Sequence, residues 1–233
     1  MVSEAIEYSD GGTALTGLLY RPSGQPRAAI LVYPTIMNQS GVVLDKAASL
    51  AQHGYLAFVA DLYGRNPETF EESREFAAEI RPQPQDFRRR LRGAIRALVA
   101  LPGSEGLPLG AIGFCMGGGA VLELAREGAP LDVVVSFHGL LATDLPAEPG
   151  KVTARILVCH GDADPMVPRS HVVQFWEEMD AAGADWHFHS YGGVKHGFTN
   201  PHSPPGNPAV GYDASADRQS WAAMFELFDE VFV

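Results

Sequence analysis

The hydrophobic and polar positions of this chain follow two different periods. Short, continuous apolar runs recur along it, a pattern typical of strands that are buried on both faces of a parallel sheet. Between these runs, apolar positions repeat with a helical period and stop at Gly or Pro, which predicts amphipathic helices. The apolar runs cover residues 28–33, 56–60, 109–114, 131–137 and 156–159, and the helical patterns cover 42–53, 86–101, 116–126 and 171–182.

The beginning of the chain has a third pattern. Residues 5–8 and 13–20 alternate between polar and apolar around Asp10-Gly11-Gly12, which predicts an antiparallel hairpin. Strand and helix alternate after it, so we expect an α/β fold with a mostly parallel central sheet, an antiparallel N-terminal hairpin and helices on both faces. A single domain is expected over residues 1–233. The remaining expected elements are a helix at 69–80, a strand at 185–191, a helix at 216–232 and a functional surface loop at 199–211.

Composition and charge narrow the class of protein. The chain has 28 acidic and 17 basic residues, a net charge of -11, which argues against a nucleic-acid partner. No stretch reaches the roughly 18 apolar residues that span a bilayer, and residues 1–10 lack the pattern of a signal peptide. We therefore expect a cytoplasmic protein without a membrane partner, present as a monomer or a small homo-oligomer.

A glycine-flanked cysteine stands where a buried strand must turn directly into a helix. The segment Gly113-Phe114-Cys115-Met116-Gly117 forces a strained backbone at its centre, and glycines on either side let strand and helix approach. A thiol at a helix N-terminus is favoured as thiolate, and the Met116 N–H points at an oxyanion on the attacked carbonyl. Cys115 is therefore the predicted nucleophile; the alternative is a small buried residue needed only for packing.

The second cysteine is expected to be inert. Cys159 ends an apolar run, where a buried thiol is the common state. With two cysteines in the whole chain, neither a disulfide framework nor a zinc site with paired cysteines is indicated.

A candidate acid and a candidate base follow the predicted nucleophile in the chain order that is typical of a fold with this turn. Two aspartates, Asp162 and Asp164, come after the strand that ends near His160, and either could be the acid. Asp164 is favoured because it lies farther out on the loop, whereas Asp162 is placed to bond its own turn. His196, between glycines and after the next strand, is the predicted base because its pKa lies near neutrality.

The other histidines carry weaker signals. His187 and His189 share one face of a strand and, with Asp162, could be read as metal ligands. Alternating strand histidines are more often surface or core residues, so no metal site is expected. His138 and His160 follow strands and are better candidates for lining a pocket than for chemistry.

With these residues in place, the chain resembles the dienelactone hydrolase (carboxymethylenebutenolidase) family of α/β-hydrolases. The resemblance implies the α/β-hydrolase fold and hydrolysis of a small ester or lactone through a thioester acyl-enzyme. It also implies Cys115, Asp164 and His196 as catalytic triad, with no cofactor. The matching segments are 54–55, 61–65, 113–118, 161–168 and 196–198.

The resemblance also implies a substrate pocket. It assigns the backbone N–H of Ile36 as the second oxyanion donor beside Met116. Two positions depart from the family pattern. Members that act on dienelactone carry a Glu where this chain has Thr35, and an Arg that holds the substrate carboxylate where it has Asn200.

Several basic residues are candidates for holding an anion in that pocket. Arg74 and Arg81 lie in the region where the family places a second carboxylate-binding Arg. The run of arginines between 88 and 96 is interpreted as a solvated helix face instead. Thr35, Asn200, Arg74, Arg81 and His138 are thus the candidate pocket residues.

Two functions of different classes are compatible with this pattern. The first is a hydrolase acting on carboxylic ester or lactone bonds, with a small-molecule substrate. The second is a non-catalytic ligand-binding or thiol redox-sensing protein on the same fold. The acid and base that accompany Cys115 favour the hydrolase, because a sensor thiol does not need Asp164.

Overall fold

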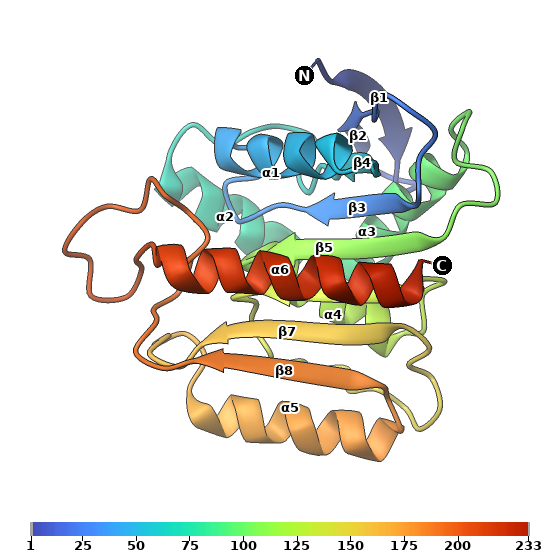
Figure 1. Ribbon diagram of the computed structural model, residues 1–233. Helices are drawn as coiled ribbons and strands as arrows, with labels where there is room; N and C mark the ends of the chain where they lie inside the picture. Colours follow the sequence, from blue (N-terminus) through green and yellow to red (C-terminus); the bar gives the residue numbers. More distant parts are fainter. Residues whose placement is uncertain (1, 233) are drawn as a thin grey trace. The chain divides into compact units, whose positions relative to one another are not determined.

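The computed structural model describes residues 2–232 of the chain. It divides into two compact units, which meet in the sequence between Ile112 and Gly113. Figure 1 draws the first unit in blue to green and the second in green to red. Strand β5 (Leu109–Phe114) spans the boundary between them. Both units contain strands and helices, as the alternating pattern of the sequence predicted.

The first unit combines an antiparallel start with a parallel pair. The hairpin β1–β2 is antiparallel, β2 pairs antiparallel with β4, and β3 pairs parallel with β4. The predicted N-terminal hairpin is confirmed. The strands are β1 (Glu4–Ser9), β2 (Ala14–Tyr20), β3 (Ala29–Tyr33) and β4 (Leu56–Val59), and the helices are α1 (Gly41–Gln52), α2 (Phe70–Ile80) and α3 (Pro84–Val99).

The second unit is built on parallel strands. Strand β6 pairs parallel with β7. Strand β8 pairs parallel with β7 along the whole length of β8 (Figure 1). Because parallel strands end at one edge, the loops after them gather there, and that edge is where such sheets bind ligands. The strands are β6 (Val133–Phe137), β7 (Arg155–Gly161) and β8 (Trp186–Tyr191), and the helices are α4 (Met116–Arg126), α5 (Arg169–Ala182) and α6 (Ala214–Val231).

Helices cover both faces of the second unit's sheet. A Cβ added to Gly118 of α4 would lie 2.9 Å from Ser136 Oγ, so α4 packs on the face to which Ser136 points. The next residue, Phe137, stacks on Trp221 of α6 with ring centroids 5.9 Å apart. Successive side chains of a strand point to opposite faces, so α4 and α6 pack on opposite sides. In Figure 1, α6 crosses in front of the strands.

Helix starts differ from the prediction where a local signal begins the helix earlier. Helix α3 begins at Pro84, two residues before the expected start, because proline is well suited to the first helical position. Helix α6 begins at Ala214, because the Asp213 carboxylate accepts hydrogen bonds from Ser215 N at 3.0 Å and Ala216 N at 2.8 Å. No helix within residues 2–232 is long and apolar enough to cross a membrane.

The interpretation of the arginine run on α3 as wholly solvated is wrong. Arg88 is buried, and Arg90 clamps the β1–β2 turn. Its Nε donates to Asp10 Oδ2 at 2.6 Å, and its other nitrogens donate to Leu62 O at 2.8 Å and Thr13 Oγ1 at 2.7 Å. Burial raises the pKa of Asp10, but backbone N–H groups and Arg90 outweigh it and lower that pKa to about 2. The helix face thus carries an ion pair that ties it to the hairpin.

Candidate functional site

The predicted nucleophile lies on a sharp turn between β5 and α4. Cys115 has φ 55° and ψ -113°, a backbone conformation that is costly for a residue with a side chain. A Cβ on Gly113 would lie 1.9 Å from the carbonyl oxygen of Gly117, so no other residue fits there. Cys115 is half-buried, and α4 begins with the very next residue, Met116. The turn therefore has the geometry expected of a nucleophile elbow.

The backbone of the elbow is held by the end of β6. The Cys115 N–H donates to Phe137 O at 3.0 Å and to His138 Nδ1 at 3.1 Å. His138 is 2% exposed and has φ 41°, and its Nε2 lies 2.9 Å from Thr199 Oγ1. His138 was predicted to line the pocket, and its contacts join it to the elbow and to the loop after His196. Thr199 is buried too; the sequence offered no signal for it beyond its place three residues after His196.

Of the two candidate acids, Asp164 is the one next to the predicted base, His196. Asp164 Oδ2 lies 2.6 Å from His196 Nδ1, and its other oxygen accepts the Met166 N–H at 2.8 Å. Asp162 instead pairs with the exposed Arg169 guanidinium at 2.9 and 2.6 Å, rather than bonding its own turn as expected. Both oxygens of Asp164 are therefore engaged, and the carboxylate is oriented toward the histidine.

The charge of His196 is set by its neighbours. Its side chain is buried, which lowers its pKa, but the Asp164 carboxylate and the Cys115 side chain outweigh burial and raise the pKa to about 10. The raised pKa favours the imidazolium form of the ring, the form that a thiolate–imidazolium pair requires. His196 Nε2 is also buried, and it makes no hydrogen bond of standard geometry.

The loop after β8 is anchored at several points. Residues 199–211, predicted to be a functional surface loop, return so that Val210 forms a parallel bridge with His196. His196 N donates to Ala209 O at 3.3 Å, and its carbonyl accepts the Gly211 N–H at 3.0 Å. Lys195 Nζ adds a bond to Asn207 O at 2.8 Å. The loop thereby fixes the backbone of His196.

Two titratable side chains of β7 are buried. Burial raises the pKa of Cys159 to about 12, so this thiol stays protonated at neutral pH, as an inert cysteine should. His160 is 1% exposed, and neither of its ring nitrogens has a hydrogen-bond partner. Burial lowers the pKa of His160, so its ring is neutral.

Thr35 and Ile36 lie on the turn after β3. The resemblance assigns the Ile36 N–H as an oxyanion donor, and Thr35 stands where members that act on dienelactone carry Glu. Thr35 and Ile36 are both half-buried, and Tyr63 Oη donates to Ile36 O at 3.1 Å. Asn38, with φ 53°, donates from Nδ2 to Asp61 Oδ1 at 2.9 Å and ties this turn to the segment after β4. Asp61, in the segment 61–65 that matches the family, therefore helps to hold the turn after β3. The donor role of the Ile36 N–H stays a prediction.

The other pocket candidates lie in different settings. Arg74 is exposed on α2, and Arg81 is exposed just after that helix. Asn200 is half-buried in a turn, where its Oδ1 accepts the His202 N–H at 2.9 Å. Contact of these three residues with a substrate stays a prediction.

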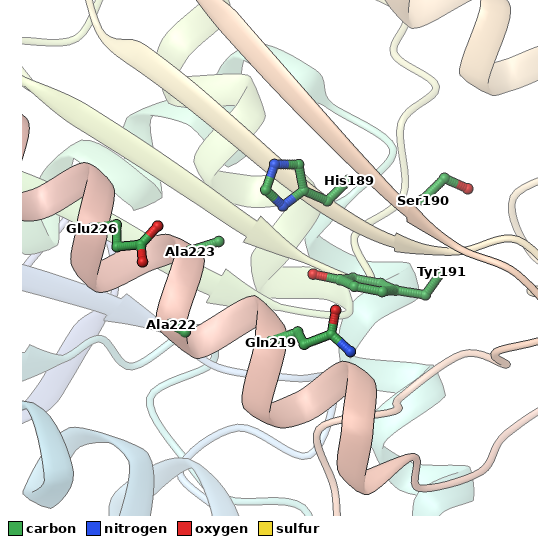
Figure 2. Close-up of a pocket in the computed structure, with 7 residues that line it drawn as sticks. All are labelled: His189, Ser190, Tyr191, Gln219, Ala222, Ala223 and Glu226. Atoms are coloured by element: carbon green, nitrogen blue, oxygen red, sulfur yellow. The ribbon is translucent and has the colours of Figure 1, made fainter.

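A separate cavity of about 460 Å³ lies between β8 and α6 of the second unit. Figure 2 shows side chains from the strand and from the helix that line it. None of these residues is among the predicted site residues. They are His189, Ser190, Tyr191, Gln219, Ala222, Ala223 and Glu226.

Known proteins are similar to this chain over nearly its whole length. The model of the dienelactone hydrolase family matches residues 15–232. A solved structure named m3DLH is 36% identical, covers 99% of this chain and 98% of its own, and superposes with a TM-score of 0.93. A dienelactone hydrolase-like promiscuous phosphotriesterase from metagenomic libraries is 33% identical over 99% of this chain and 98% of its own, with a TM-score of 0.92.

A curated relative is also similar over most of its length. A Bradyrhizobium protein named "Probable 2-oxo-3-(5-oxofuran-2-ylidene)propanoate lactonase" is 28% identical over 206 residues, which are 83% of this chain and 82% of that protein. The family match covers nearly the whole chain and includes Cys115, Asp164 and His196. The chain therefore belongs to the dienelactone hydrolase family of α/β-hydrolases.

Proposed function

We propose that this hydrolase cleaves small carboxylic esters or lactones through a thioester on Cys115. The observation that carries the proposal is the buried Asp164–His196 pair, 2.6 Å apart, whose imidazolium is stabilised by the Cys115 side chain. A carboxylate, an imidazole and a thiol in this relation form the constellation of an activated nucleophile.

Acylation begins at the sulfur. The Cys115 thiolate attacks the carbonyl carbon, a carbon–sulfur bond forms, and the carbonyl electron pair moves onto oxygen. The Met116 N–H belongs to the first turn of α4, whose N–H groups and dipole stabilise that negative oxygen. When the tetrahedral intermediate collapses, the carbon–oxygen bond breaks and the leaving alkoxide takes the proton of His196 Nε2. With a lactone, the alcohol stays attached to the acyl chain.

Deacylation uses the same residues in reverse. His196, now neutral, removes a proton from water while the oxygen of that water attacks the thioester carbon. The carbon–sulfur bond breaks, and the thiolate–imidazolium pair is restored. Asp164 holds Nδ1–H throughout, so that Nε2 is the nitrogen that exchanges protons.

A second activity is favoured by one specific likeness. The solved neighbour described as a promiscuous phosphotriesterase is 33% identical to this chain over 99% of its length. A thiolate that attacks a carbonyl carbon can also attack the phosphorus of an activated phosphotriester and expel an aryloxide. We therefore include a phosphotriester among the compounds to test.

Intact mass spectrometry tests the covalent step. We expect wild-type protein mixed with an activated aryl acetate to gain the mass of one acetyl group. The phenol leaving group should be released in a burst. Cys115→Ala should gain none, whereas Cys159→Ala, which removes the only other cysteine of the chain, should acylate like wild type. A Cys115→Ala protein that still hydrolyses the ester would sink the proposal. Failure of wild type to react with esters, lactones and phosphotriesters would favour the non-catalytic thiol sensor.

A further inference from the structure

We propose that His138 is a positioning residue that holds the nucleophile elbow and the loop of the catalytic base in one arrangement. The proposal rests on the function proposed above. The imidazole of His138 joins the two segments directly, because one ring nitrogen contacts the backbone of Cys115 and the other contacts Thr199.

The hydrogen bonds of His138 define the tautomer of its ring. A backbone N–H can only donate, so the Cys115 N–H requires a proton-free Nδ1 on His138. The ring proton of the neutral imidazole then lies on Nε2, where it donates to Thr199 Oγ1 at 2.9 Å. His138 is therefore a neutral ring with both nitrogens engaged, and it is 2% exposed. A general base needs a free lone pair, so this ring is suited to orientation rather than to proton transfer.

The same ring also packs against the base itself. His138 meets the ring of His196 edge to face, with centroids 5.2 Å apart, and it also meets the ring of Phe198 edge to face at the same centroid distance. The segment from His196 to Thr199 is thus held at both ends by one side chain. An imidazole is the natural choice here, because it offers an acceptor, a donor and an aromatic edge in one rigid ring.

The elbow needs such support because its backbone is strained. Cys115 has φ 55° and the adjoining His138 has φ 41°, two positive values at residues that are not glycine. Strained backbone persists only where the surroundings over-determine it, and reacting atoms must be placed within fractions of an ångström. Loss of the bond from the Cys115 N–H to His138 should therefore let the Cys115 sulfur and the His196 imidazole move apart while the substrate still binds.

Two amide substitutions separate the roles of the two nitrogens. In His138→Asn the amide oxygen reaches the position of Nδ1 and can still accept the Cys115 N–H, and Asn tolerates a positive φ. In His138→Gln the longer amide reaches the position of Nε2 near Thr199 instead. Thr199→Val keeps the His138 ring and removes the second bond with almost no change of shape.

The readouts are kcat and KM for an activated ester, the alkylation rate of Cys115 by iodoacetamide, and the thermal unfolding temperature. We expect His138→Gln to lower kcat and the alkylation rate by about 10- to 100-fold with KM within about threefold of wild type. In His138→Asn, kcat and the alkylation rate should both stay within about fivefold of wild type. Thr199→Val should lower kcat by about 3- to 10-fold.

Three results would overturn the proposal. These are a His138→Gln protein with kcat within threefold of wild type, equal loss in the Asn and Gln variants while both stay folded, and full kcat in Thr199→Val. If His138→Gln is unfolded at the assay temperature, Thr199→Val decides alone. Failure of the proposed function is distinguishable, since it appears as hydrolysis by Cys115→Ala and not as indifference to position 138.

Discussion

At the scale of single residues, the proposed mechanism depends on the Asp164 carboxylate, which favours the charged form of the His196 imidazole. His196 is buried, which by itself would leave it neutral, yet Asp164 and Cys115 raise its pKa to about 10. In the mechanism proposed above, this raised pKa keeps on the ring at neutral pH the proton that the leaving alkoxide receives. Catalysis should persist as long as that proton stays, and it should be lost when the ring deprotonates.

This charge arrangement predicts an alkaline limit of activity that depends on Asp164. Because the pKa of His196 is raised, kcat/KM of wild type should fall only as pH rises through about 10. Asp164→Asn removes the carboxylate, so kcat should drop by about 10³- to 10⁴-fold, and the alkaline limb should move to lower pH.

The measurement is the pH dependence of kcat/KM, with the spontaneous hydrolysis in the presence of Cys115→Ala subtracted. Asp162→Asn is the matched control, because Asp162 pairs with exposed Arg169 and not with the base. An alkaline limb that moves in Asp162→Asn and stays in place in Asp164→Asn would assign the acid to the other aspartate.

At the scale of elements, the junction of β5 and α4 makes the elbow possible. The carbonyl of Gly117 approaches Gly113 so closely that any Cβ there would overlap backbone, which cannot swing away as a side chain can. Glycine is required here because there is no space for a side chain, and not because of a conformational preference. The helix can then begin directly beneath the thiol, and its N-terminal dipole acts on the thiolate.

Alanine at this junction should be far more harmful than alanine elsewhere. Gly113→Ala is expected to destabilise the protein by about 3 kcal/mol and to abolish acylation, because strand and helix must separate. Gly192→Ala is the matched control in the same unit, since a Cβ there meets nothing within 4 Å and its φ is not positive. Thermal unfolding of both variants checks this, and equal unfolding temperatures would show that the junction can relax.

At the scale of the whole molecule, net charge bears on the choice of substrate. The chain carries a net charge of -11, and Thr35 and Asn200 stand where the resemblance implies a carboxylate and a carboxylate-binding arginine. An acidic protein disfavours the approach of anions, and salt screens this effect. The substrate is therefore expected to be neutral rather than anionic.

A pair of esters with the same leaving group tests this expectation. We predict that p-nitrophenyl butyrate is hydrolysed with a kcat/KM about 3- to 10-fold higher than p-nitrophenyl succinate at low ionic strength, and that the ratio shrinks as salt is added. Preference for the succinate ester would point to a basic anchor. Arg74→Ala and Arg81→Ala would then show which predicted arginine provides it.

Much of the molecule could be predicted from local pattern. The buried strands, the N-terminal hairpin and helix 116–126 all follow from periodicity and glycine spacing. These signals are local in sequence, so one chain is enough to read them. The expectation of one domain over residues 1–233 and the catalytic roles of Cys115, Asp164 and His196 stay predictions.

Only the tertiary structure decided which residues meet. It paired Asp164 with His196 and sent Asp162 to Arg169, although both aspartates lie on one loop. It also turned Arg90 from a presumed surface residue into a clamp on Asp10. Most of these partners lie tens of residues apart, and no periodicity records such pairs.

His138 shows the same division most clearly. Its place after a strand marked it in the sequence as a residue near the site, but its two bonds, to Cys115 N and Thr199 Oγ1, join segments 23 and 61 residues away. Sequence by itself determined the kind of turn, the cysteine at its centre and the edge of the sheet where it lies. The direction of each side chain and the identity of its partner were decided by packing, because they depend on contacts that exist only once the chain has folded.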